Sequence, residues 1–300
     1  MINKNCPLIF THIPKTGGMS MFAAMCEHHG MKMADLYNIS IRDTDKAPVE
    51  KLLTDQEKSV FAGHFPFGLH EWLSRPSCYM AIVRKPLDRI ISLYYYSIQF
   101  REITLKAREE WTSFQALFDN RIVPDFYVDF LPWIQGEQTQ TKFLRCLSAE
   151  LDNGMVRRFS GFGLNAKPCP KEALGEAKRN IERYYSLVGV QEQFQDTMDL
   201  VSIMFDVNLT EYHINKGVKK NDTEEKLTLK IRQRINEMNR LDNDLYQWVV
   251  NRFNKKLLNP GEPIIVPGGG RTDYGQMKLW HAIGSSPKRT GAMELSPANK

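Results

Sequence analysis

The stretch LIFTHIPKTGGMSMF, residues 8–22, constrains the fold of this chain more than any other. Its apolar start predicts a buried strand over residues 8–13, because a short apolar run bounded by a proline is typical of a core strand. Apolar side chains then recur at helical spacing and predict a helix over residues 20–29, ended by Gly30. A strand, a glycine-bearing turn and a helix together favour a phosphate-binding site, because the first N–H groups of the helix face the anion.

The turn between the strand and the helix has the residues that such a loop needs. Glycines let the backbone adopt dihedrals that other residues avoid and approach an anion closely. Lys15 adds a positive charge, and Thr16 and Ser20 offer hydroxyl donors. A plain strand-to-helix turn with a surface lysine is the alternative for two adjacent glycines, but the whole string favours the loop. We assign to the loop Pro14, Lys15, Thr16, Gly17, Gly18, Met19 and Ser20.

The lysine of this loop precedes the glycines, whereas the usual nucleotide-hydrolase loop, G-x-x-x-x-G-K-[ST], has it after them. That motif does not occur in the sequence, and no clear acidic residue ends an apolar strand to hold magnesium, as phosphoryl transfer needs. The loop therefore predicts a nucleotide ligand with chemistry that needs no metal.

Three further apolar runs predict strands at residues 60–65, 78–83 and 186–190. Helical patterns lie between and after them, including residues 192–205 and a charged region, 223–257, that LDND (241–244) divides. Strands that alternate with helices predict an α/β fold: a P-loop-like, mainly parallel β-sheet flanked by helices in three α/β/α layers. We expect a single domain over residues 1–258 and an irregular C-terminal extension over residues 259–300, which is rich in Pro and Gly.

A second anion site follows the strand at residues 78–83. Arg84 ends that strand, Pro86 suits the first turn of a helix, and Ser92 lies two turns further on. An arginine fork with a hydroxyl is a good clamp for a phosphate, although a strand-capping arginine and a surface serine are the alternative. Ligands of parallel sheets bind beyond the carboxyl ends of the strands, so we expect this site beside the loop. Two anion sites predict a ligand with two separated phosphates.

Composition excludes several other classes of protein. The 300 residues have a net charge of +5, which suits an anionic ligand but does not indicate nucleic-acid binding. No segment reaches the roughly 18 apolar residues of a membrane span, and no signal peptide is visible, so we expect a cytoplasmic protein. Nothing in the sequence indicates an oligomeric state. Five cysteines without C-x-x-C pairing argue against a zinc site or a disulfide framework, and no metal is expected.

The two motifs HIPKTGGMS and VRKPLDRIISLYYY together resemble the paired signature of sulfotransferases that use 3′-phosphoadenosine-5′-phosphosulfate (PAPS). The branch with heparan sulfate 2-O-sulfotransferases and many bacterial enzymes is the most similar. Weaker likenesses are GHFPFGLHEWL, EQTQTKFLRCLS, LVGVQEQF and LDNDLYQWVVNRF, so the resemblance covers residues 8–257. The chain departs from the family pattern at Met19, where Thr is usual and a hydroxyl is lost, at Lys85, where Asp is common, and at Lys142, where Arg is usual.

The resemblance implies transfer of a sulfuryl group from PAPS to a hydroxyl of a carbohydrate or small-metabolite acceptor. Lys15 would stabilise the leaving 5′-phosphate together with the loop N–H groups, and Arg84 and Ser92 would hold the 3′-phosphate. His64, at the end of an apolar run, is the candidate base, because an imidazole with a pKa of about 6.5 can accept a proton at pH 7. A histidine that only bonds a backbone carbonyl is the alternative.

Other residues near these motifs have less specific interpretations. His12 is expected to be a structural strand residue, whereas His70 could line an acceptor pocket and Glu71 is a weaker candidate base. The basic run at residues 214–220 could approach the cofactor or be a solvated loop. Two other functions stay open: a metal-dependent, kinase-like phosphotransferase, and a non-catalytic binder of sulfated or phosphorylated ligands.

Overall fold

A computed structural model describes the sheet, most of its helices and the two motif regions. The described residues are 6–29, 33–35, 57–73, 76–93, 150–162, 168–205, 209, 229–258, 264–266 and 270–272. The region around Lys142, the basic run at residues 214–220 and most of the extension beyond residue 258 lie outside them.

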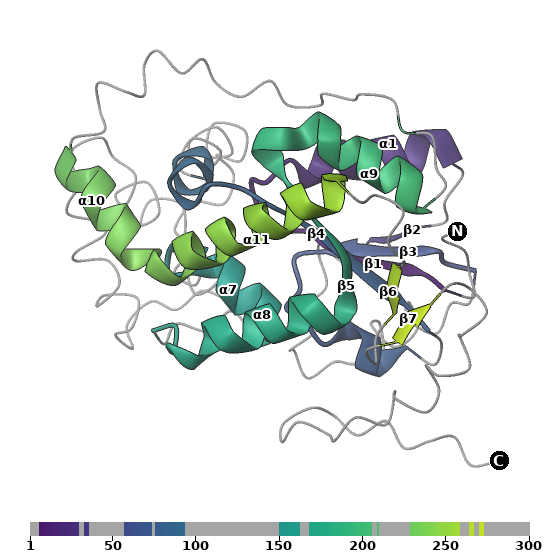
Figure 1. The fold of residues 1–300 in the computed structure, drawn as a ribbon, viewed down its shortest axis with the longest axis horizontal. Helices are drawn as coiled ribbons and strands as arrows, with labels where there is room; N and C mark the ends of the chain where they lie inside the picture. Colours follow the sequence, from purple (N-terminus) through teal and green to yellow (C-terminus); the bar gives the residue numbers. More distant parts are fainter. Residues whose placement is uncertain are drawn as a thin grey trace, which may run out of the picture.

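A five-stranded parallel sheet is the centre of the molecule (Figure 1). Its strands have the order β2-β3-β1-β4-β5, so β1 and β4 occupy inner positions and every residue of both is buried. This burial explains why the strands are continuous apolar runs, since both faces of a parallel sheet are covered. The bounds are Leu8–Thr11 for β1, Met33–Asp35 for β2, Val60–Gly63 for β3, Cys78–Val83 for β4 and Tyr185–Val190 for β5.

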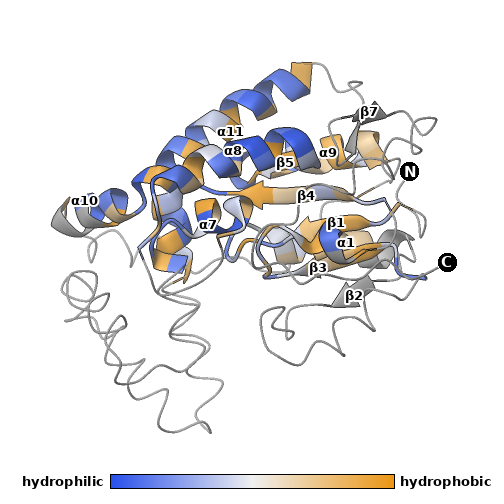
Figure 2. Ribbon diagram, turned by 90° about the horizontal axis from the view of Figure 1, so that it is seen from below, coloured by the Kyte–Doolittle hydropathy of each residue, from blue (hydrophilic) through white to orange (hydrophobic). Residues whose placement is uncertain are grey.

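Helices cover both faces of this sheet, which confirms the predicted α/β fold. In Figure 1, α1 and α9 lie along one side of the strands and α7 and α8 along the other, while α11 packs against β5, α7 and α8. Figure 2 shows the apolar residues gathered on the strands and the polar ones on the outer helices. The bounds are Gly18–His29 for α1, Gly154–Ser160 for α7, Glu172–Tyr184 for α8, Phe194–Phe205 for α9, Leu229–Met238 for α10 and Arg240–Leu258 for α11.

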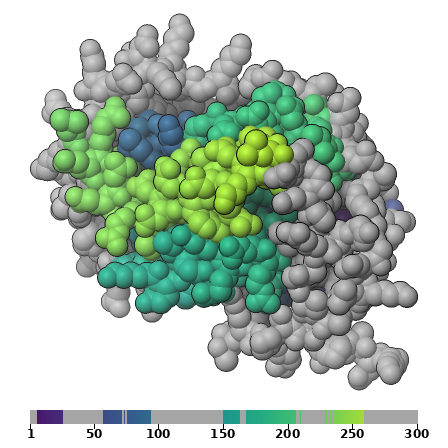
Figure 3. Space-filling view, viewed as in Figure 1, coloured from purple at the N-terminus to yellow at the C-terminus, as the bar shows by residue number. Residues whose placement is uncertain are grey.

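Shorter elements complete the described part. Residues 86–93 are helical, and two 3₁₀ turns, η1 at Leu69–Trp72 and η2 at Gln191–Gln193, follow the regions of β3 and β5. Together, α8, α9, α10 and α11 form much of the surface in Figure 3. None of the described helices combines the length and the hydropathy that a bilayer crossing requires.

The structure differs from the sequence predictions in the bounds of several elements and in the region beyond residue 258. The first helix begins at Gly18 rather than at residue 20. The charged helical region breaks at Asn239, whereas LDND, the predicted break, lies within α11. The C-terminal region that was expected to be irregular contains an antiparallel strand pair, β6 (Ile264–Val266) and β7 (Gly270–Thr272), and β6 lies against β4, β5 and α8.

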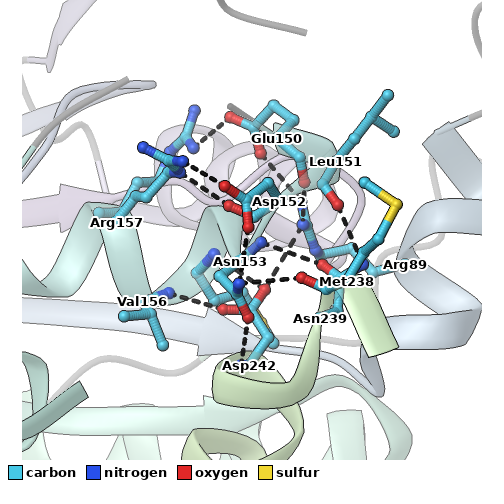
Figure 4. A network of polar contacts seen from close by, with 12 residues as sticks. Arg89, Glu150, Leu151, Asp152, Asn153, Val156, Arg157, Met238, Asn239 and Asp242 are labelled. Carbon is cyan, nitrogen blue, oxygen red and sulfur yellow. Dashed lines mark hydrogen bonds and ion pairs between the residues drawn. The ribbon is translucent and has the colours of Figure 1, made fainter. Parts of the chain in front are cut away.

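A buried cluster of ion pairs connects the helix at residues 86–93 to α7 and α11 (Figure 4). Arg89 is fully buried, and its Nη1 lies 2.9 Å from Oε2 of Glu150, while its Nη2 donates to the Glu150 carbonyl at 2.6 Å. Arg158 of α7 pairs with the same carboxylate, and Asp242 of α11 lies 3.6 Å from Arg89. Removing one partner from such a cluster leaves an uncompensated buried charge, so the cluster strongly favours this arrangement of helices.

The break at Asn239 has its cause in the same cluster. Asn153 adopts a left-handed conformation with φ of 53°, and its side chain joins the Met238 carbonyl to the Asp242 N–H. The Asp242 carboxylate accepts hydrogen bonds from the N–H groups of Met155 and Val156 at 3.1 and 2.8 Å. It thus satisfies N-terminal N–H groups of α7, a role that a cap from the neighbouring sequence more often fills.

Candidate active site

The ends of three neighbouring strands bring the sequence-predicted residues to one edge of the sheet. The spatial order β3-β1-β4 places the residues after each strand side by side. His64 follows β3, the loop with Lys15 follows β1, and Arg84 follows β4. A hydrogen bond of 3.1 Å from Nη1 of Arg84 to the Lys15 carbonyl joins the second and third of these directly. The two motifs, about seventy residues apart in the chain, therefore form one site.

The loop backbone has the form of an anion-binding nest. Lys15 and Gly17 have positive φ angles of 68° and 83°, and Thr16 between them does not. Backbone of alternating hand turns successive N–H groups toward a common concavity, where an anion can sit. A positive φ at a residue other than glycine costs roughly 1–2 kcal/mol, so the conformation of Lys15 is strained. Such strain is typical of functional loops.

The hydroxyl of Thr16 does not have the role that the sequence predicted. Thr16 is fully buried, and its Oγ1 donates a hydrogen bond of 2.8 Å to the carbonyl of Ile13. Its proton is therefore used inside the loop and is not offered to a ligand. Thr16 shapes the turn, and only its backbone N–H remains suited to an anion. Ser20, by contrast, has a half-buried side chain in the first turn of α1.

Residue 18 requires a glycine for a different reason than residue 17. Its φ is not positive, so no unusual dihedral requires glycine there. A Cβ added at residue 18 would instead lie 2.9 Å from Cγ of His12 and still closer to the far atoms of that ring. The imidazole of His12 thus packs directly on the backbone at the start of α1. The permissive dihedrals that the sequence suggested for both glycines apply to Gly17 alone.

Two cations share the centre of the site. Burial, and next the nearby charge of Arg84, lower the pKa of the Lys15 ammonium from 10.5 to about 8. Burial likewise lowers the pKa of Arg84, while the charges of Asp88 and Glu192 oppose that effect. Within the described part of the chain, Nε of Arg84 is buried without a hydrogen-bond partner. An anionic ligand would stabilise these two desolvated cations and would offer an acceptor to the Nε–H of Arg84.

His64 has a defined tautomer. Its Nδ1 lies 2.8 Å from the carbonyl oxygen of His12, and because a carbonyl only accepts hydrogen bonds, Nδ1 must carry the proton. The neutral ring therefore has its lone pair on Nε2. The His64 side chain is exposed, and its ring centroid lies 4.7 Å from that of His12. The carbonyl bond, considered from sequence as the alternative to a base, orients the ring as a base requires.

His12 is the structural residue that the sequence predicted. Its side chain is buried, and its ring stacks on Phe10 with centroids 5.7 Å apart. Burial lowers the pKa of His12 well below its usual value, and a positive charge on His64, and next those of Arg158 and Lys15, would lower it further. His12 is therefore neutral at pH 7 and adds no competing charge beside Lys15.

The comparisons with known proteins agree with this geometry. Residues 1–249 match the model of the sulfotransferase family. The chain belongs to the sulfotransferase family. It is 29% identical over 228 residues to the heparin sulfate O-sulfotransferase of Drosophila melanogaster, an alignment that covers 69% of this chain and 58% of that protein.

A second Drosophila protein, the uronyl 2-sulfotransferase homolog pip, is 22% identical over 214 residues, which are 65% of this chain and 40% of that protein. The chain thus spans less than two thirds of the length of either relative. The match confirms the resemblance that the paired motifs indicated.

Other residues near this candidate site differ in how well the structure accounts for them. Met19, where the family pattern has Thr, is 41% exposed at the start of α1. Ser92 is half-buried on the helix that begins at Pro86. His70 packs against the rings of Phe67 and Tyr184, and its Nδ1 lies 2.8 Å from the Tyr79 hydroxyl. Among the described residues, no three His, Cys, Asp or Glu side chains gather as a metal site.

The turn after β5 also borders the site, and the residue-by-residue interpretation of the sequence did not include it. A Cβ at Gly17 would lie 3.3 Å from Phe194 and 3.4 Å from Gln191, so this turn packs against the loop. Glu192 between them accepts a hydrogen bond from the Lys85 N–H at 2.8 Å. The only sequence signal was LVGVQEQF, whose likeness to a family block assigned no role to single residues.

Proposed function

We propose that this protein transfers the sulfuryl group of PAPS to a hydroxyl of a carbohydrate acceptor. Family membership supports the reaction class, and the names of the two relatives, a heparin sulfate O-sulfotransferase and a uronyl 2-sulfotransferase homologue, support the acceptor class. The observation that carries the proposal is the convergence of Lys15, Arg84 and His64 at three adjacent strand ends.

The described residues fit a donor with two phosphates. PAPS supplies an activated sulfuryl group on its 5′-phosphate and carries a separate 3′-phosphate. The nest and the Lys15 ammonium suit the 5′-phosphate, where negative charge grows as the sulfur–oxygen bond breaks. Arg84, which has a buried Nε without a partner, and the Ser92 hydroxyl suit the 3′-phosphate. Because Lys15 and the loop N–H groups supply this stabilisation, we infer that the reaction needs no metal.

His64 takes the proton of the acceptor hydroxyl at Nε2. As the acceptor oxygen bonds to sulfur, its proton moves to this nitrogen and His64 becomes an imidazolium. The His12 carbonyl, 2.8 Å from Nδ1, keeps the ring oriented and bonds the charged form more strongly. His12 itself stays neutral, because burial lowers its pKa, so the transferred proton remains on His64.

The test is release of 3′-phosphoadenosine-5′-phosphate (PAP) from PAPS in the presence of de-O-sulfated heparin, with small hydroxyl compounds as comparison acceptors. We expect Lys15→Ala to lower kcat by about 10² to 10³ and His64→Ala by about 10² to 10⁴. Lys171→Ala, an exposed lysine beside α8, is the matched control and should leave the rate unchanged.

Three results would overturn the proposal in different ways. If neither PAPS nor PAP raises the melting temperature of the wild-type protein, the donor assignment is wrong. If PAP binds but no acceptor releases it from PAPS, the protein is a binder without turnover. If phosphorylated product forms from ATP and Mg²⁺ instead, the kinase-like alternative holds.

A further inference from the structure

Glu192 joins three segments that are distant in sequence. It lies in η2, directly after β5. Its Oε1 accepts a hydrogen bond of 2.8 Å from the backbone N–H of Lys85, which is 107 residues away. Its Oε2 accepts a second hydrogen bond, of 3.0 Å, from the hydroxyl of Tyr246 in α11. An exposed carboxylate with both oxygens bonded in this way is a brace between the turn after β4 and α11.

The turn that this brace holds is the one that carries Arg84. Lys85 follows Arg84 directly, so the Glu192 bond restrains the backbone from which the guanidinium extends. Arg84 in turn donates to the Lys15 carbonyl at 3.1 Å. Gln191, directly before Glu192, and Phe194, two residues after it, pack against Gly17 of the loop. The turn after β5 therefore contacts both halves of the candidate donor site.

If only its negative charge mattered, Glu192 should weaken the binding of an anion to this site. A carboxylate beside Arg84 partly cancels the positive potential that attracts a phosphate, and the neighbouring groups Asp88 and Lys15 are charged as well. Removing the carboxylate should then tighten phosphate binding if its charge were what mattered. If its geometry matters more, removal should weaken binding. The direction of the change in phosphate affinity therefore distinguishes an effect of charge from an effect of geometry.

We propose that Glu192 is a positioning residue for the donor: it holds the Arg84 turn in the geometry that grips the 3′-phosphate, and Tyr246 holds Glu192. This inference rests on the proposed function. Glu192 touches no reacting atom in this account, and its effect passes through the Lys85 N–H and Arg84. Because its side chain is exposed, its substitution is not expected to prevent folding.

The test measures PAP affinity by isothermal titration calorimetry at fixed ionic strength. Glu192→Ala removes both hydrogen bonds, and we expect about tenfold weaker binding, because the Arg84 turn must then be ordered when the phosphate binds. Glu192→Gln removes the charge but keeps an oxygen for the Lys85 N–H and an amide group for the Tyr246 hydroxyl, so its affinity should stay within about twofold of wild type. In turnover, Glu192→Ala should raise KM for PAPS and leave KM for the acceptor unchanged.

Two further variants separate positioning from charge. Asp196→Ala removes an exposed carboxylate from the start of α9, on the same segment, and should leave PAP affinity unchanged. Tyr246→Phe removes the hydroxyl that holds Glu192 and should weaken binding by about threefold in wild type but not in the Glu192→Ala background.

Tighter binding in both Glu192 variants would overturn the inference in favour of a charge effect, and unchanged binding in Glu192→Ala would overturn it outright. If wild-type protein does not bind PAP, the proposed function fails and this inference fails with it.

Discussion

Alanine in place of Gly18 is the substitution whose effect the structure predicts most sharply. In helical geometry, glycine to alanine by itself stabilises a protein by roughly 0.5–1 kcal/mol, and Gly18 lies in the first turn of α1 without a positive φ. Helix propensity therefore predicts a more stable variant. Packing predicts the reverse, because the new Cβ would lie 2.9 Å from Cγ of His12 and closer still to the ring atoms beyond it.

The size of the packing effect follows from the surroundings of His12. Carbon atoms in contact prefer a separation of about 3.5–4.0 Å, so the ring must retreat by roughly 1 Å or more. It has little room to do so, since it is buried and lies against the rings of Phe10 and His64, at centroid distances of 5.7 and 4.7 Å. Overpacking of this kind costs about 1–3 kcal/mol, which exceeds the gain in helix propensity. We expect a net loss of roughly 1–2 kcal/mol in the free energy of unfolding.

With His64 as the base of the proposed function, the displacement should also slow catalysis. The His12 carbonyl orients His64, and a misplacement of about 1 Å in a catalytic group can cost around 10² in rate. Urea unfolding and PAP release measure the two effects. His12→Ala frees the space, so the cost of Gly18→Ala should largely vanish in that background. A Gly18→Ala protein that is as stable and as active as wild type would refute this reasoning, as would equal costs in both backgrounds.

Three further predictions concern protons and hydroxyls. Because burial and Arg84 lower the pKa of Lys15 to about 8, PAP affinity should fall as pH rises from 7 to 9, and titrations that give a constant Kd would contradict the role of that charge. Thr16→Val should destabilise the protein by about 1 kcal/mol through the lost bond to the Ile13 carbonyl, while Thr16→Ser retains stability in thermal unfolding. Burial raises the pKa of Asp242 from 3.8 to about 6, so the folded state holds this proton more tightly than the unfolded chain. The unfolding free energy of wild type relative to Asp242→Asn should therefore fall by an amount of the order of 2 kcal/mol between pH 4 and 6, and parallel pH profiles would rule this out.

The polar cluster around Arg89 shows why some of the structure could not be predicted from sequence. Arg89 lies in the motif VRKPLDRIISLYYY, where it looks like any surface arginine on a helix. Its burial depends on Glu150 and Asp242, which come from regions 61 and 153 residues further along the chain. The helix break at Asn239 has the same origin, because Asn153 and Asp242 stabilise the ends of two different helices.

Several features were determined by the sequence alone, because they depend on neighbouring residues. The apolar runs of β1, β4 and β5 and the strand–loop–helix at residues 8–29 follow from local pattern and backbone preference. Parallel pairing then follows from the alternation with helices, and it places Lys15 and Arg84 at one edge of the sheet.

Only the tertiary structure decided what each residue of that edge contacts. The ring of His12 packs on residue 18 and leaves no room for a Cβ there, and the hydroxyl of Thr16 donates its hydrogen bond to the carbonyl of Ile13. Nδ1 of His64 donates to a carbonyl 52 residues away, and Glu192 reaches the turn of Arg84 across 107 residues. Hydrogen bonds and close packing act over a few ångströms in space and have no fixed spacing in sequence. Local patterns therefore located the loop in this member of the sulfotransferase family, and contacts between distant segments set the tautomer, the packing and the hydrogen bonds around it.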